Sequence, residues 1–156
     1  MIKIYRLLYN INIVYYLIIS VSLALSMSFI VGFLLNIIHI ENTFSNYKIS
    51  KLEFKYIIAL TVFVIPIVET LVFQVFMFWI LKNISPALKN IIISILFAAN
   101  HYYTIKQIIF SFFLCCLFNF SYMYSLKRKW NSFLVVTLIH SSYNFIVSMV
   151  YYSIRN

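Results

Sequence analysis

Long apolar blocks separated by short polar stretches dominate this chain. The blocks run over residues 9–38, 56–81, 87–103, 107–126 and 131–152, with boundaries that are approximate. All but the third reach the roughly 20 residues that an α-helix needs to cross the hydrocarbon core of a bilayer. The pattern predicts an all-α, multi-pass transmembrane helix bundle of about five helices.

One long hydrophilic stretch, residues 39–55, divides the chain into two parts. We expect residues 1–55 to form an N-terminal membrane helix followed by a polar loop, and residues 56–152 to form a second unit. The first block is too long for the apolar region of a signal peptide and is followed by no small-residue cleavage site, so it is interpreted as a retained span.

Composition excludes an ordinary soluble domain. Of the 156 residues, 64% are hydrophobic, 20% are aromatic and only 10% are charged, whereas soluble proteins carry about 25% charged residues. A net charge of +9 would suggest nucleic acid in a soluble protein. Here the basic residues lie between or beyond the apolar blocks, where they act as topology signals and contacts for anionic lipid. We therefore expect a lipid bilayer and no nucleic acid as partner.

The distribution of lysine and arginine bears on orientation. Successive blocks alternate in direction, so the basic residues divide between two sides of the membrane. Seven share the side of the N-terminus and five the other; these are residues 3, 6, 82, 89, 127, 128 and 129 against 48, 51, 55, 106 and 155. The positive-inside rule then predicts a cell-membrane protein whose N-terminus is cytoplasmic, by a narrow margin.

Glu69 is the most informative single residue. The chain has three acids, and Glu41 and Glu53 fall in the hydrophilic stretch while Glu69 lies in the middle of the block 56–81. An ionisable side chain at membrane depth costs a few kcal/mol or more and marks a functional site by default. Pro66, three residues earlier, removes one backbone hydrogen bond and is expected to kink the helix and open room near the acid.

Two histidines and an asparagine lie at a similar depth. At about 1.5 Å per residue, Glu69 lies about 18 Å from the charged turn that ends its block. His101 lies about 20 Å from the start of the next block, on the same side. His140 and Asn144 lie about 15 and 21 Å from the basic end of the last block, again on that side. Three blocks of alternating direction thus bring polar groups to one layer.

Spacing within the blocks adds to this prediction. His140 and Asn144 are four residues apart (HSSYN), so they stack on one helix face and can present two polar groups to one point, an oxyanion or a metal. Phe97 and His101 (FAANH) share the same spacing, and so do Thr70 and Gln74 in ETLVFQ.

Together and in this order, these motifs resemble those of the CAAX-processing and bacteriocin-processing protease family (CPBP, also called Abi). That family carries the motifs EExxxR, FxxxH and HxxxN, each on its own membrane helix. Here they correspond to Glu69-Thr70-x-x-x-Gln74, Phe97-x-x-x-His101 and His140-x-x-x-Asn144. The resemblance covers residues 56–152, which would be the protease core.

The resemblance implies an intramembrane endopeptidase with four catalytic residues. Glu69 would be the general base that activates a water, His101 would hold or polarise that water, and His140 and Asn144 would stabilise the oxyanion. Phe97, Thr70 and Gln74 would be supporting residues. Thr70 and Gln74 depart from the family pattern by replacing a glutamate and an arginine, a neutral pair in place of a charged one.

The sequence leaves three alternatives open. Glu69, His101 and His140 form a His2Glu set that suits a divalent metal such as zinc with an open position for water; we favour a mechanism without a cofactor. The chain also fits a non-catalytic membrane protein of the same fold, for example a bacteriocin immunity protein that binds its target, or less readily a small transporter. As an enzyme its partner would be a membrane-associated peptide or protein substrate.

Overall fold

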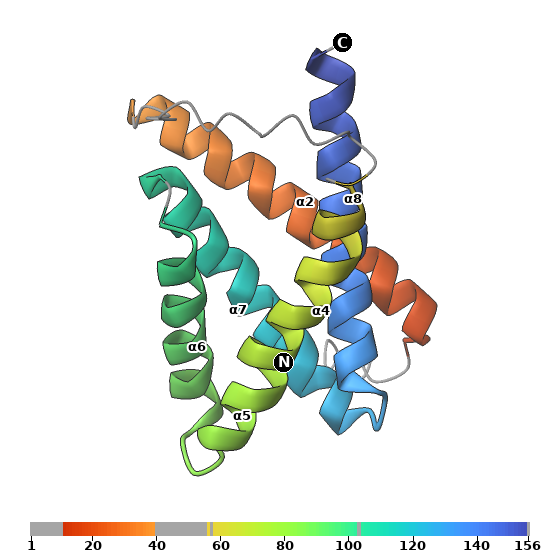
Figure 1. The fold of residues 1–156 in the computed structure, drawn as a ribbon. Coiled ribbons are helices and arrows are strands. Elements are labelled where there is room, and N and C mark those ends of the chain that lie inside the picture. Colours follow the sequence, from red (N-terminus) through yellow and green to blue (C-terminus); the bar gives the residue numbers. More distant parts are fainter. Residues whose placement is uncertain (1–10, 40–55, 57, 103, 156) are drawn as a thin grey trace.

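The structure is a computed structural model of the chain and describes residues 11–39, 56, 58–102 and 104–155. The hydrophilic stretch expected at residues 39–55 lies, apart from its first residue, outside this part. Within it the chain folds into a bundle of helices (Figure 1). The predicted all-α, multi-pass architecture with five helices is confirmed, because four helices are long and apolar enough to cross a membrane and one apolar helix is shorter.

The second of these helices is built from four consecutive segments, which we call the second span. The elements in chain order are α2 (Ile13–Ile37), the second span with η1 (Ala59–Val64), α4 (Ile65–Glu69), η2 (Thr70–Phe76) and α5 (Met77–Ile80), then α6 (Pro86–Asn100), α7 (Ile105–Lys127) and α8 (Ser132–Arg155). Both η segments are π-helical, with the wider turn that this hydrogen-bonding pattern produces.

Four of the five helices begin at a side chain that caps them. Asn12 accepts a hydrogen bond from the backbone N–H of residue 14, Ser85 from residue 88, Thr104 from residue 107 and Asn131 from residue 134. Such caps satisfy backbone donors that have no partner in the first helical turn. The short polar linkers of the sequence therefore fix where the helices start.

The π-helical turns explain how the second span keeps one face toward the bundle. Its buried residues recur every four positions: Val62, Pro66, Thr70, Gln74 and Phe78. In a regular α-helix a four-residue step advances by about 40° beyond a full turn, so a stripe of this length would wind away from its neighbours. The wider π-helical turns take up that excess.

The third helix is shorter than the sequence predicted. The apolar block suggested a helix to residue 103, whereas α6 ends at Asn100 and spans only 15 residues, or about 22 Å. His101 leaves the helical conformation with φ −105° and ψ 43°, and Phe97 and Ala98 carbonyls near the helix end accept bonds from His101. His101 therefore lies at the end of a helix that is too short to cross the hydrocarbon core of a bilayer.

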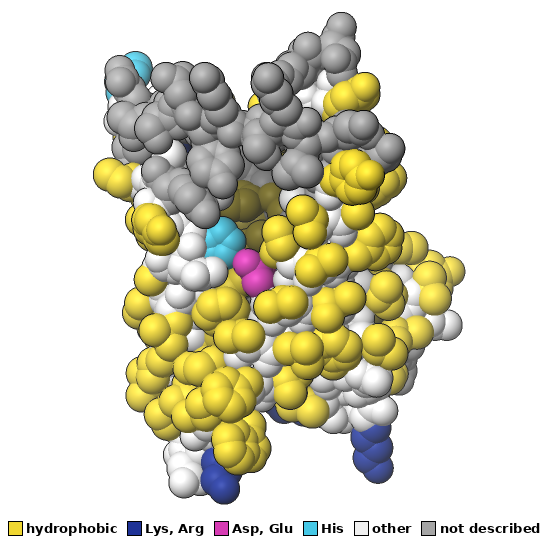
Figure 2. Space-filling view, in the orientation of Figure 1, with side chains coloured by type: hydrophobic (Ala, Val, Ile, Leu, Met, Phe, Trp, Pro, Cys, Tyr) yellow, Lys and Arg dark blue, Asp and Glu magenta, His cyan; other side chains and the backbone are white. Residues whose placement is uncertain are grey.

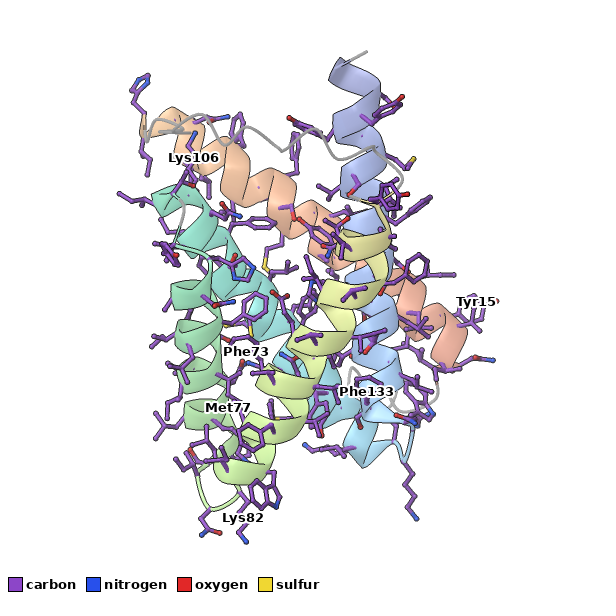
Figure 3. The ribbon with its side chains drawn as sticks, viewed as in Figure 1. Tyr15, Phe73, Met77, Lys82, Lys106 and Phe133 are labelled. Carbon is purple, nitrogen blue, oxygen red and sulfur yellow. The ribbon has the colours of Figure 1, made fainter. Side chains whose placement is uncertain are left out.

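Helices α7 and α8 lie at the centre of the bundle (Figure 1). Helix α2 packs on both of them from one side, and the second span packs on both from the other side. Helix α6 packs against α7. The turns after Leu81 and Lys127 lie at one end, with Lys82 labelled there and Lys106 at the opposite end (Figure 3). Lys106 Nζ donates to Asn36 Oδ1 at 2.7 Å, which joins the end of α2 to the start of α7.

Candidate functional site

Glu69 ends α4, where the helix changes to the π-helical η2. It precedes the buried stripe residue Thr70 and lies one turn from Phe73, whose ring meets the edge of the Phe97 ring of α6 at a centroid distance of 5.0 Å. This places Glu69 on the flank of the second span that faces α6 rather than on its lipid-facing side. Its side chain is 14% exposed.

The carboxylate of Glu69 lies between two imidazoles. His101 Nε2 is 3.6 Å from Oε1, and His140 Nε2 is 3.7 Å from Oε2. Each carboxylate oxygen thus faces its own histidine, one from the end of α6 and one from the middle of α8. Both distances exceed the roughly 2.7–3.2 Å of a direct hydrogen bond, so the three groups are close together without being bonded to one another.

The orientation of the His101 ring follows from its other nitrogen. Nδ1 lies 2.8 Å from the carbonyl oxygen of Phe97, and because a carbonyl only accepts, Nδ1 carries the hydrogen. In the neutral ring Nε2 then presents a lone pair toward Glu69. The ring also packs on the Phe97 ring at a centroid distance of 4.5 Å. The FxxxH spacing thus fixes both the position and the tautomer of the histidine.

His140 is held by burial. It is 5% exposed, and its ring lies against Phe118 of α7 at a centroid distance of 4.6 Å and near Phe97 at 6.5 Å. Its neighbours in α8, Val136 and Ile139, are fully buried. The aromatic residues around the site therefore leave His140 little freedom except to point at Glu69.

Asn144, one turn beyond His140, makes a contact that the sequence did not predict. Its Nδ2 donates to the backbone carbonyl of Thr61 in η1 at 2.8 Å. In the π-helical register, in which Ile65 N–H bonds to the carbonyl of Leu60, the Thr61 carbonyl would receive its bond from residue 66. That residue is proline and has no N–H. Asn144 supplies the missing donor and ties α8 to the second span.

The supporting residues of the first motif face inward. Thr70 is completely buried, and its hydroxyl has no hydrogen-bond partner within the described structure. Gln74 is 1% exposed and its Nε2 donates to Asn119 Oδ1 of α7 at 3.2 Å. Gln74 therefore takes part in a buried polar contact between helices, five residues along the second span from Glu69.

Sequence reasoning missed the rest of that contact. Asn119 Nδ2 lies 3.0 Å from Asn90 Oδ1 and 3.2 Å from Ser94 Oγ, both on α6, and 3.6 Å from Cys115 Sγ. We call Gln74, Asn90, Ser94, Cys115 and Asn119 the asparagine cluster. A lone asparagine within the apolar block 107–126 was the available signal, because amide side chains in membrane helices often bond across helices.

The site opens through an apolar surface. The one acid among the described residues, Glu69, is visible at the edge of a hollow with an imidazole beside it, and hydrophobic side chains cover most of the surrounding face (Figure 2). The carboxylate is therefore reachable from a face that otherwise suits lipid.

Glu69, His101 and His140 are the residues that the metal alternative would use as ligands. Within residues 11–39, 56, 58–102 and 104–155, no group of three or more His, Cys, Asp and Glu side chains is arranged to hold a metal ion. The mechanism without a cofactor stays a prediction.

A comparison with protein families identifies what the chain is similar to. The model of the family described as type II CAAX prenyl endopeptidase Rce1-like matches residues 51–146, and this range includes Glu69, His101, His140 and Asn144. No curated protein and no solved structure matches the chain.

Proposed function

The chain belongs to the type II CAAX prenyl endopeptidase Rce1-like family, and we propose that it is an intramembrane endopeptidase that uses Glu69 to activate a water. The observation that supports this most directly is the Glu69 carboxylate placed between two imidazoles in a hollow of an apolar face. Peptide hydrolysis needs a base, a positioned water and donors for the developing negative charge.

In this proposal the water binds between Glu69 and His101. A point about 2.8 Å from both atoms of the 3.6 Å pair Oε1 and Nε2 exists to one side of the line between them. Both atoms accept there, so the two hydrogens of one water are directed at them and an oxygen lone pair points away. Glu69 takes one proton as this oxygen attacks the scissile carbonyl carbon.

The opposite side of the site would receive the negative charge. Attack converts the carbonyl oxygen into an oxyanion, which His140 stabilises in its Nε2–H form together with the second amide hydrogen of Asn144, whose first hydrogen bonds to Thr61. Collapse of the intermediate breaks the C–N bond, and Glu69 returns its proton to the leaving amine. The protonation state of Glu69 is thereby restored.

The substrate class follows from the surroundings of the site. Hydrophobic side chains cover most of the described surface beside and below the hollow (Figure 2), so a membrane-associated protein or peptide suits it better than a soluble one. The family description names a CAAX prenyl endopeptidase. For this chain we propose that the substrate is a membrane peptide and that its cleavage can serve bacteriocin immunity. We place the protein in the cell membrane, with the end of the bundle that carries Lys82 in the cytoplasm.

The test compares protein termini in membranes of cells that express wild type or Glu69→Gln at matched levels. Val68→Leu is the matched control, because residue 68 neighbours Glu69 but is 51% exposed on the lipid-facing side. Termini present with wild type and Val68→Leu and absent with Glu69→Gln would support a protease and identify its substrate.

Identical termini in all three strains would contradict the proposal if both variants insert and fold. A bacteriocin-protection assay on the same strains then addresses the non-catalytic alternative. Protection that survives Glu69→Gln would indicate a binding protein of the same fold.

A further inference from the structure

The asparagine cluster joins three helices below the site. Gln74 lies on η2, Asn90 and Ser94 on α6, and Asn119, completely buried, on α7. Asn119 accepts from Gln74 through Oδ1 and donates to the α6 residues through Nδ2. One amide thus bonds in two directions, toward the helix of Glu69 and toward the helix of His101.

The second span packs less extensively on α6 than on α8. α6 rests mainly on α7, while its contact with η2 is small; the second span packs more on α8. The position of Glu69 relative to His140 is therefore determined by a broad contact, to which the Asn144–Thr61 hydrogen bond adds. The position of Glu69 relative to His101 depends on fewer contacts. These are the Phe73–Phe97 ring pair, Lys89 Nζ over the ring of Phe78, and the link through Gln74 and Asn119.

The asparagine cluster lies close enough to Glu69 and His101 to influence their separation. Gln74 follows Glu69 by five residues and Ser94 precedes His101 by seven, so the cluster lies roughly 7–10 Å below the site on both helices. A shift between the second span and α6 at this level would change the gap between Glu69 and His101 directly. A displacement of about 1 Å in reacting groups can reduce a rate about 100-fold.

We propose that Asn119 is a positioning residue: by bonding Gln74 to α6 it sets the separation of Glu69 and His101. The significance of that separation for catalysis rests on the proposed function, while the positioning itself does not. The cluster also accounts for Gln74 where the family motif has arginine. A neutral amide at this position matches a neutral partner on α7, and the pair needs no buried counter-charge.

The experiment uses the full chain purified in detergent and measures hydrogen–deuterium exchange by mass spectrometry. Asn119→Leu and Gln74→Leu replace the amides by apolar side chains and remove the bond from either end. Each should raise exchange at residues 95–102 at least about fivefold and leave residues 135–145 unchanged. The double variant should match Asn119→Leu, because that substitution already removes the bond that Gln74→Leu removes.

Ser121→Ala is the matched control, since Ser121 is also completely buried on α7 but is not part of the cluster. It should leave exchange at 95–102 unchanged. If Asn119→Leu does not fold, Gln74→Leu decides, because it leaves the bonds of Asn119 to α6 in place. Unchanged exchange at 95–102, a uniform rise along the chain, or additive effects of the two substitutions would overturn the proposal.

A second measurement in cells separates this proposal from the proposed function. Yield of the Glu69-dependent termini should fall about 100-fold in both leucine variants and remain at the wild-type level in Ser121→Ala. A local exchange effect without loss of termini would contradict a role in catalysis. If wild type itself produces no Glu69-dependent termini, the protease proposal fails. The hydrogen–deuterium exchange pattern then remains the test of the positioning role of Asn119.

Discussion

Replacing Asn144 by leucine should destabilise the protein, because its amide donates the bond that Pro66 cannot provide to the Thr61 carbonyl. The bond is 2.8 Å long and partly buried. A typical intramolecular hydrogen bond contributes about 0.5–1.5 kcal/mol to stability, and interhelical bonds within membranes average about 0.6 kcal/mol with a maximum near 1.7. We expect a loss of about 1–1.5 kcal/mol in the free energy of unfolding.

Restoring the backbone donor should recover most of that loss. Pro66→Ala reintroduces an N–H at the residue that serves Thr61 in the π-helical register. In the Pro66→Ala background, Asn144→Leu should therefore lower the free energy of unfolding by less than about 0.5 kcal/mol. This corresponds to a coupling free energy of about 1 kcal/mol between the two positions. Activity should not return with stability, because the second amide hydrogen proposed for the oxyanion is still missing.

The assay is reversible unfolding in mixed micelles with increasing SDS, followed by tryptophan fluorescence, alongside the yield of Glu69-dependent termini. Asn144→Asp serves as a control that has similar shape but lacks the amide donor. Additive losses for Pro66→Ala and Asn144→Leu would refute the assignment of the Thr61 bond. Recovery of activity in the double variant would instead refute the oxyanion role and leave Asn144 as a tether only.

Three further predictions concern other parts of the molecule. Lys129 has φ 58° at the end of α7, so Lys129→Gly should raise the free energy of unfolding by about 1 kcal/mol and Lys129→Ala should not, measured by thermal unfolding in detergent. Phe97→Leu keeps α6 apolar but removes the ring that packs on His101, and it should lower the yield of Glu69-dependent termini up to about tenfold. Cleavage by purified protein of a peptide spanning one such terminus should be the same with and without EDTA; loss that added zinc reverses would favour the metal alternative.

Much of the fold could be predicted because it depends on local properties of the chain. Apolar length determines which segments cross the bilayer, and the polar linkers with Ser85, Thr104 and Asn131 determine where helices begin. Depth along each helix follows from a constant rise per residue. For this reason the sequence placed Glu69, His101 and His140 in one layer before any contact was known.

Other features depend on how the helices rotate and cross, which no local pattern specifies. The apolar blocks did not reveal that α6 stops at Asn100, that the second span contains π-helical turns, or that Asn144 bonds to the Thr61 carbonyl. Asn119 looked like one polar residue in an apolar block, and its partners Gln74 and Asn90 are 45 and 29 residues away along the chain.

The sequence alone thus determined the helices, their depths and the chemical groups at the site, because hydrophobic length and helical rise act within each segment. The tertiary structure decided which atoms face one another: His101 Nε2 and His140 Nε2 on opposite oxygens of Glu69. The physical reason is that side-chain packing sets helix rotation to within a fraction of a turn, and that rotation determines whether a polar group at the right depth meets a partner or lipid.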